Sequence, residues 1–413
     1  MKPFAPIVLS CVVAGSAVAL AACLVDLSNL SGGTLDGGAS GGASSSGSTT
    51  AAATSGDGSS TTGAGAGGAT STAASSSSAS GSGAGGMMIA GCPGAVLDCS
   101  GCACPAGGCA AVPLATGNDA NSPRNITTSS EGVFWSDTVD GQIMGILANE
   151  TTPQVIVKAS KPTALAAAAG RLVFAAQDGL WTCLLPACDA TKSHLAGSIA
   201  PGSVQSVAYD GQLAYWADRG DGVNTGNGEI QRCDPATDCS APVLIADQQL
   251  LAKGLFLTAN SLFWMAQGNG QSNGSIHKSP RTAAGETVIT AALVLPTGLA
   301  ADDTYVYWTQ GTASGAVLRC DHTQGYCQTP VNVAQKAGAL GLPLDLAIAG
   351  GRLYWNENGK GTISSCPLPG CGAAESPRVH ATGRQGVHRI AVGSTCLLWT
   401  DDVNGGTVDK VGR

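Results

Sequence analysis

The chain has 413 residues, of which 12% are charged and 4% aromatic, and its formal net charge is −8. Nucleic-acid binding needs a basic surface, so this charge balance argues against a nucleic-acid partner. The length is sufficient for a domain with a full hydrophobic core.

Residues 1–22 have the features of an export signal. Lys2 precedes an apolar stretch that is too short for a membrane span and leads into a polar tract. The stretch ends in Leu20-Ala21-Ala22-Cys23, which resembles the lipobox of bacterial lipoproteins. The resemblance implies cleavage before Cys23 and diacylglycerol on its thiol. Because Leu24 follows rather than Asp, it also implies an outer-membrane or cell-surface location. The alternative is an ordinary signal with an incidental cysteine.

Residues 23–90 combine this cysteine with a low-complexity linker. Between residues 31 and 86 nearly every residue is Gly, Ser, Ala or Thr. Such a segment cannot bury enough apolar surface to offset its ordering entropy, so we expect disorder. A flexible coil of this length reaches roughly 40 Å, which suits a tether between a lipid anchor and a folded domain. A structured Gly-rich layer is the alternative, but no fixed period is visible.

Residues 91–103 form a cysteine-rich segment, and residues 104–413 carry a repeat. Each unit has a turn, a short apolar run and an aromatic pair that ends in Trp. The tryptophans are Trp135, Trp216, Trp264, Trp308, Trp355 and Trp399. In a degenerate copy Ala175 stands in for Trp, and the spacings are then 40, 41, 48, 44, 47 and 44 residues. Four strand-like segments per unit, joined by short turns, predict an all-β fold, a seven-bladed β-propeller.

The seventh unit ends after its third strand, so its fourth strand must come from elsewhere. Residues 104–114 resemble the ends of other units. We therefore expect Val112–Ala115 to supply the outer strand of the last blade, which would leave no free edge.

The units resemble the YWTD repeats of low-density-lipoprotein-receptor propellers, with Tyr307-Trp308-Thr309-Gln310 and Leu398-Trp399-Thr400-Asp401 as the nearest matches. Those receptors have six blades, whereas this chain has seven units. The units resemble more closely the repeat lipoproteins of myxobacteria, whose propeller has no assigned function. The resemblance covers residues 104–413 and bears on architecture rather than activity.

Sixteen cysteines in an exported chain favour disulfides. Five pairs occur at one place in the repeat, between the third and fourth strands: Cys104 with Cys109, Cys183 with Cys188, Cys233 with Cys239, Cys320 with Cys327, and Cys366 with Cys371. Cys92, Cys99, Cys102 and Cys396 remain, and one bond is expected to tie Cys396 to the N-terminal segment. The alternative for Cys99-Ser100-Gly101-Cys102 is zinc binding or thiol exchange.

No nucleophile elbow, zinc-protease or phosphate-loop motif occurs, so we predict no catalytic residue and no cofactor. The five histidines are isolated in sequence, which is typical of surface residues.

One face of a propeller carries the loops between second and third strands and the loops that join blades. Here the acidic candidates are Asp137, Asp218, Glu357 and Asp401, and the basic ones are His388 and Arg389. Together they would suit a polar ligand or a cation. The alternative is that these residues only shape turns.

Two functions are compatible with this pattern. The first is a monomeric, lipid-anchored, non-catalytic module that binds a protein, a peptide or a glycan. The second is an exported propeller lyase or hydrolase with a metal-assisted site near the axis, where His388 and Arg389 would act.

Overall fold

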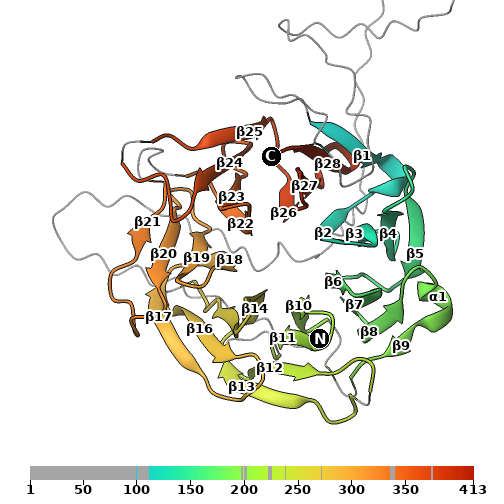
Figure 1. The fold of residues 1–413 in the computed structure, drawn as a ribbon, viewed down its shortest axis with the longest axis horizontal. Helices are drawn as coiled ribbons and strands as arrows, with labels where there is room; N and C mark the ends of the chain where they lie inside the picture. Colours follow the sequence, from blue (N-terminus) through green and yellow to red (C-terminus); the bar gives the residue numbers. More distant parts are fainter. Residues whose placement is uncertain are drawn as a thin grey trace, which may run out of the picture. The chain divides into compact units, whose positions relative to one another are not determined.

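Seven four-stranded antiparallel sheets surround a common axis in the computed structural model (Figure 1). It describes Cys99 and residues 111–196, 199, 202–221, 226–237, 239–270, 272–334, 340–373 and 375–413. The predicted signal, the linker, Cys23 and the rest of the cysteine-rich segment lie outside these residues. The prediction of an all-β, seven-bladed propeller is confirmed.

Each blade is numbered by its order along the chain. Blade 1 contains β2 (Pro123–Ser129), β3 (Gly132–Asp137), β4 (Gln142–Leu147) and β5 (Gln154–Lys158). Blade 2 contains β6 (Ala164–Ala168), β7 (Arg171–Ala176), β8 (Gly179–Leu184) and β9 (Ser193–His194). Blade 3 contains β10 (Val204–Tyr209), β11 (Ala214–Asp218), β12 (Gly228–Cys233) and β13 (Val243–Gln249). Blade 4 contains β14 (Ala252–Leu257), β15 (Ser261–Ala266), β16 (Gly274–Pro280) and β17 (Thr287–Leu293).

The remaining blades follow the same order. Blade 5 contains β18 (Pro296–Ala301), β19 (Tyr305–Gln310), β20 (Val317–Asp321) and β21 (Val331–Asn332). Blade 6 contains β22 (Pro343–Ala349), β23 (Arg352–Glu357), β24 (Thr362–Pro367) and β25 (Arg378–Thr382). Blade 7 contains β26 (Val387–Val392), β27 (Cys396–Asp401), β28 (Thr407–Gly412) and β1 (Val112–Thr116). A short helix, α1 (Cys188–Thr191), and two 3₁₀ turns, Gly117–Asp119 and Val403–Gly405, complete the described elements. None of the described helices is long and apolar enough to cross a membrane.

The ring is closed by pairing its two ends. β1 runs antiparallel to β28, with Val112 opposite Lys410 and Thr116 opposite Thr407. This confirms that an N-terminal strand supplies the fourth strand of the last blade. At the same seam Cys99 forms a disulfide with Cys396, as expected for one of the four remaining cysteines.

The six repeat tryptophans are core residues between blades. Each is at most 1% exposed. Trp355 packs with Tyr307 and Val317 of the preceding blade, and Trp399 packs with Tyr354 and Ile363 in the same way. Replacing such a side chain with Ala typically costs about 3–5 kcal/mol. The repeat is therefore explained by packing between blades.

Blade 2 departs from the expected alignment. Phe174, rather than Ala175, pairs with the inner-strand leucine Leu165 and packs against Phe134 of blade 1. Ala175 instead faces Trp216 of blade 3. Phe174 therefore occupies the tryptophan position, and the assignment of Ala175 to it is wrong by one residue.

Leu165 pairs with Phe174 in the same register as Ile126 with Trp135. The blades differ before this pair. In the six Trp-containing blades the pairing of first and second strands shifts near the start of the first strand, for example between Pro123 and Ile126 and between Val387 and Arg389. In blade 2 it is continuous. A bulge re-aims the side chains within it. Arg124, Asp345 and His388 lie within these shifts and belong to the site described below.

Four of the five predicted hairpin disulfides are present: Cys183–Cys188, Cys233–Cys239, Cys320–Cys327 and Cys366–Cys371. The fifth predicted bond, between Cys104 and Cys109, falls outside the described residues, so for Cys104 and for Cys109 the pairing stays a prediction. With Cys99–Cys396, the four hairpin bonds indicate an extracytoplasmic protein.

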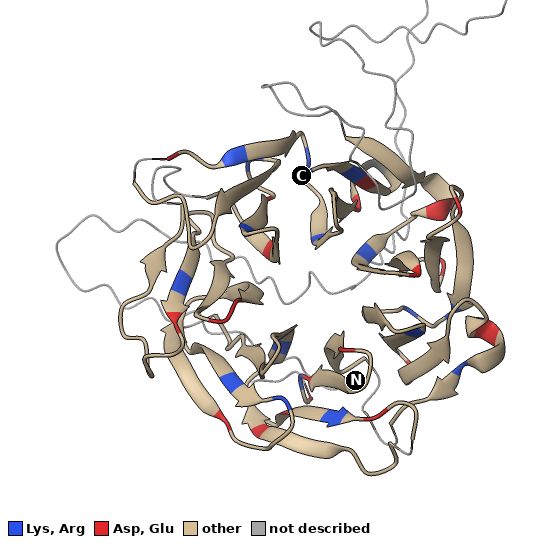
Figure 2. Cartoon of the chain, viewed as in Figure 1, with Lys and Arg blue, Asp and Glu red and all other residues tan. Residues whose placement is uncertain are grey.

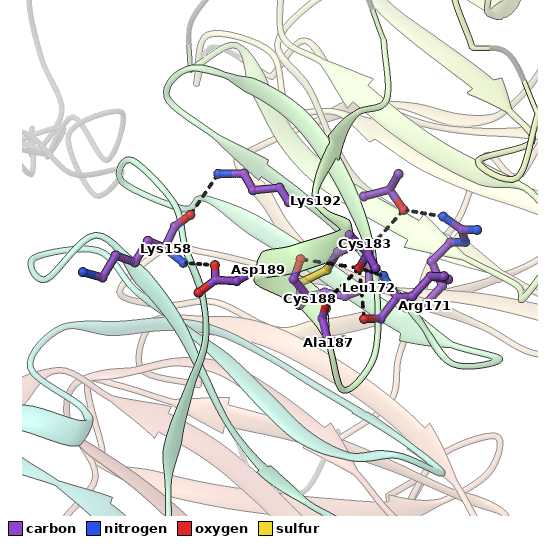
Figure 3. Close-up of a disulfide and its surroundings, with 11 residues drawn as sticks. Lys158, Arg171, Leu172, Cys183, Ala187, Cys188, Asp189 and Lys192 are labelled. Atoms are coloured by element: carbon purple, nitrogen blue, oxygen red, sulfur yellow. Dashed lines mark hydrogen bonds between the residues drawn. A yellow bond between two sulfur atoms is a disulfide. The ribbon is translucent and has the colours of Figure 1, made fainter.

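One hairpin disulfide also supports a contact between blades. Cys188 begins α1, and this helix contacts blade 1 (Figure 3). Asp189 accepts a hydrogen bond from the Lys158 backbone N–H (3.4 Å), and Lys192 Nζ donates to the Lys158 carbonyl (2.9 Å). The bond from Cys183 to Cys188 therefore holds a helix that joins two blades.

Candidate functional site

The loops between second and third strands and the loops that join blades meet at one face of the ring, which we call the axial face. The Asp402 N–H, after β27, donates to the Gly386 carbonyl before β26 (3.2 Å). The Thr138 N–H, after β3, donates to the Ser122 carbonyl before β2 at the same distance. All six predicted site residues lie at the strand ends that reach this face.

Asp137 and Asp401 are buried ends of second strands. Asp137 accepts hydrogen bonds from the backbone N–H groups of Asn121 (3.0 Å) and Asp140 (3.2 Å). Asp401 accepts one from Val403 (3.1 Å). Burial raises the pKa of both carboxyls above the usual value, although these hydrogen bonds act in the opposite direction. Both side chains hold loops in place.

Glu357 and Asp218 occupy the equivalent position in blades 6 and 3. Glu357 is buried, accepts a hydrogen bond from Trp355 Nε1 (3.1 Å) and forms an ion pair with Lys360 (3.2 Å). Asp218 accepts a hydrogen bond from the Gly220 N–H (2.8 Å). The four acidic candidates therefore belong to four separate loops, and within the described part of the chain no hydrogen bond joins one to another.

His388 lies in a different environment, between blades 7 and 1. Its Nε2 is 2.8 Å from Asp402 Oδ2 and 2.7 Å from Arg124 Nη1. Arg124 also pairs with Asp402 (3.2 Å). Burial raises the pKa of Asp402, but the hydrogen bond from His388 and the charges of His388 and Arg124 outweigh it, so the pKa lies below its usual value. This half-buried group carries net positive charge whenever His388 is protonated.

Arg389 links three inner strands beside this group. Its Nη1 donates to Asp345 Oδ1 (2.7 Å) and its Nε to Asn125 Oδ1 (3.3 Å). Asp345 Oδ2 also accepts the Ile390 backbone N–H (2.8 Å), and Asn125 donates to the Thr163 carbonyl. These contacts fix the Arg389 guanidinium at the axial end of β26.

Lys253 brings a further positive charge to the axis from β14. Burial and the positive charges of Arg389 and Arg219 lower its pKa to about 8, and Asp345 opposes this only partly. The residue as a whole is partly exposed. Within the described ranges, no hydrogen bond or ion pair engages the Lys253 ammonium. Figure 2 shows basic residues on the inner strands β2, β14 and β26 around the axis.

We call Arg124, Lys253, Asp345, His388, Arg389 and Asp402 the axial cluster. The sequence prediction included His388 and Arg389 but missed Asp345. The one feature of the sequence that could have indicated Asp345 is an acidic residue near the start of an inner strand. The expectation that isolated histidines are surface residues is wrong for His277, His322 and His380, which are buried.

The axial cluster offers charge complementarity rather than a metal-ligand set. No group of three or more His, Cys, Asp or Glu side chains in the described residues is placed to hold a metal ion. The cluster has four basic side chains and two carboxylates, and both carboxylates already pair with basic groups. Its chemistry suits recognition of an anion.

Comparisons with known proteins bear on the fold. The sequence matches no protein-family model and no curated protein. Among solved structures, the chain is similar to the WD40 β-propeller domain of Doa1 (TM-score 0.54, 10% identity, 74% of this chain and 97% of that chain). It is more distantly similar to the computationally designed protein Ika8 (TM-score 0.48, 14% identity, 73% of this chain and 99% of that chain). The chain is also similar to a chain of the nidogen/laminin complex (TM-score 0.43, 13% identity, 60% of this chain and 92% of that chain). At these identities the similarity to the Doa1 domain supports the β-propeller fold alone.

Proposed function

We propose that the chain is an extracytoplasmic binding module whose axial cluster holds an anionic group of a protein, a peptide or a glycan. The observation that carries this proposal is Lys253, a partly exposed residue whose ammonium, among the described residues, forms no ion pair and feels the positive charge of Arg389. Like charges held together at the axis are unfavourable, and an anion placed between them would relieve that repulsion.

The interactions around the cluster favour a preformed site. Side-chain hydrogen bonds join the inner strands of neighbouring blades, as between Thr163 and the Val204 carbonyl (3.0 Å) and between the Leu255 N–H and Ser206 (3.0 Å). These bonds hold the inner strands in place before a ligand binds, so binding costs less conformational entropy.

Titration calorimetry with poly-L-glutamate and with polygalacturonate tests the proposal. Lys253→Met keeps the length of the side chain and removes its charge, so we expect at least about a tenfold loss of affinity, as for one charge-assisted hydrogen bond. Lys158→Met is the matched control, because Lys158 is exposed on the outer strand β5. Equal affinity of both variants and the parent protein would contradict the proposal.

The pH dependence gives a second readout. Lys253 has a pKa of about 8 and binds an anion only when protonated, so affinity should fall as the pH rises through about 8. Binding would also raise this pKa, so proton uptake should accompany binding near that pH. The buffer dependence of the binding heat measures this uptake, and Lys253→Met should abolish it.

We also propose that the module is monomeric, lipid-anchored at Cys23 and tethered by residues 24–90 at the outer membrane or cell surface. The lipobox-like Leu20-Ala21-Ala22-Cys23 and the similarity to repeat lipoproteins support this. Metabolic labelling with a fatty-acid analogue should mark the chain, and Cys23→Ser should prevent labelling. A labelled Cys23→Ser chain would exclude this anchor.

The alternative of a metal-assisted lyase or hydrolase near the axis used His388 and Arg389. In the structure these side chains contact Arg124 and Asp402, and Asp345 and Asn125. These partners support a positioning role in the axial cluster, so recognition is the function we propose there.

A further inference from the structure

A second site lies away from the axis, in a cleft of about 380 Å³ between blades 3 and 4. The end of β13 and the turn after it form one wall, and β16 with Glu286 forms the other. β13 is the outermost strand of its blade and β16 the third of the next, so the cleft is separate from the axial cluster (Figure 1).

Ser275 and His277 project into this cleft from β16. They are two residues apart on one strand and therefore share a face. Ser275 Oγ lies 2.6 Å from His277 Nε2, and Ser275 is partly exposed while His277 is buried. The imidazole stacks on Trp264 with ring centroids 5.4 Å apart and an interplanar angle of 8°. The packing fixes the ring with Nε2 toward the serine.

Glu286 faces the other nitrogen of the same ring. Its Oε1 is 2.5 Å from His277 Nδ1, in an ion-pair approach rather than a linear hydrogen bond. Gln249 Nε2 donates to both carboxylate oxygens (3.2 and 3.3 Å) and so orients them. The Gln249 side-chain oxygen accepts a hydrogen bond from Trp264 Nε1 (2.8 Å). Gln249 therefore holds both groups that contact the imidazole, the Trp264 ring and the Glu286 carboxylate.

The protonation state suits a general base. Burial lowers the pKa of His277 below its usual value, although the Glu286 carboxylate acts in the opposite direction. The imidazole is therefore neutral near pH 7 and able to accept a proton. A serine, a base within hydrogen-bond reach and an acid behind the base are the elements of an activated nucleophile.

We propose that Ser275, His277 and Glu286 form an acyl-transfer site that acts on small esters entering this cleft. Ser275 Oγ would attack the acyl carbonyl while its proton passes to His277 Nε2. The bond to the leaving alkoxide then breaks, and the alkoxide takes that proton. Water activated by His277 hydrolyses the acyl-serine and restores the serine. Asn273 lines the same cleft, and its Oδ1 accepts the Asn269 N–H (2.9 Å). This leaves the Asn273 amide NH₂ as the donor that we assign to the developing oxyanion.

Blade 6 provides a matched internal control. Ser365 Oγ lies 2.8 Å from His380 Nε2, but both residues are buried. Arg352 Nε also donates to this oxygen (3.0 Å), and in the described residues no carboxylate pairs with His380. This serine–histidine contact lacks both the acid and the cleft, so it should be inert.

The experiment treats the folded full chain with a fluorophosphonate and maps the adduct by peptide mass spectrometry. We expect modification at Ser275 in the parent protein and in Ser365→Ala, and none at this site in Ser275→Ala. Glu286→Gln should slow labelling by up to about 10⁴-fold, as for loss of the acid that orients the base in a serine triad. Labelling should fall as the pH drops through the lowered His277 pKa, and p-nitrophenyl acetate hydrolysis should follow the same variants.

An unmodified Ser275 in the folded parent protein, or a labelling rate unchanged in Glu286→Gln, would overturn the proposal. The first result needs no variant, so it stands even where a substitution impairs folding. Lys158→Met, on the exposed outer strand β5, should change neither Ser275 labelling nor anion affinity. Labelling is read by mass spectrometry and anion binding by calorimetry, so failure at the axial cluster and failure at this site are separate outcomes.

Discussion

Removal of the seam disulfide should destabilise the protein far more than removal of a hairpin disulfide. Cys99 and Cys396 are 297 residues apart, whereas Cys183 and Cys188 are five apart. Loop-closure entropy grows with the logarithm of loop length, which gives about 5–6 kcal/mol for the seam bond and about 2 kcal/mol for the hairpin bond. Because measured effects rarely exceed about 5 kcal/mol, we expect losses of about 4–5 and about 2 kcal/mol.

The two disulfides form a well-matched comparison. All four cysteines are at most 4% exposed, so paired substitution by alanine removes similar buried groups and leaves no free thiol at either bond. Guanidinium unfolding without reductant, followed by fluorescence of the buried tryptophans, gives both free energies of unfolding. The variants are Cys99→Ala with Cys396→Ala, and Cys183→Ala with Cys188→Ala.

Equal losses for the two variants would refute this reasoning. Such a result would mean that the unfolded chain retains contacts across the seam, so that the seam disulfide removes little further freedom from it. A larger loss for the hairpin variant would instead point to the α1 contacts with Lys158 as the dominant effect.

Two further predictions concern stability. Deletion of residues 104–117 removes β1, leaves β28 as an unpaired edge and should abolish cooperative unfolding; an equally cooperative and equally stable product, judged by circular dichroism, would disprove the closure. Burial and the charges of Arg378 and Arg352 lower the pKa of His380 to about 4. The unfolded histidine titrates near 6.5, so the unfolded state binds more protons below that pH and stability should fall as the pH drops from about 6.5 to about 4, by about 3 kcal/mol. His380→Gln should remove that slope from urea-unfolding free energies, and an unchanged slope would show that other groups cause it.

The fold was largely predictable because its determinants are local. Alternating apolar residues specify the strands, and the tryptophan spacing specifies the number of blades. The tryptophan position of blade 2 was harder to predict, because Phe174-Ala175 resembles a Phe-Trp pair whose second residue is replaced, whereas Leu165 pairs with Phe174 as Ile126 pairs with Trp135. Which second-strand residue pairs with the first strand is decided by the hairpin as a whole, and a two-residue motif does not encode it.

The candidate site was less predictable than the fold. Asp137 and Glu357 each lie at the end of a tryptophan strand, where a ligand-binding acid would be expected. Asp137 instead accepts backbone N–H groups, and Glu357 pairs with Trp355 and Lys360. Ser275 and His277 are visible in sequence as neighbours on one strand face. The approach of Glu286 depends on side-chain packing across a hairpin, and the sequence contains no direct signal of it.

The closure of the ring also determines the order in which the fold is completed. β1 is the first of the described strands to be synthesised, and its partner β28 ends at Gly412. Blades 1–6 can therefore form while β1 still lacks its ladder, and Cys99 has to wait for Cys396 to be made. The most distant contact in the ring is the last to form, so seam closure should limit the folding rate. Until β28 pairs with it, β1 therefore has an unpaired edge.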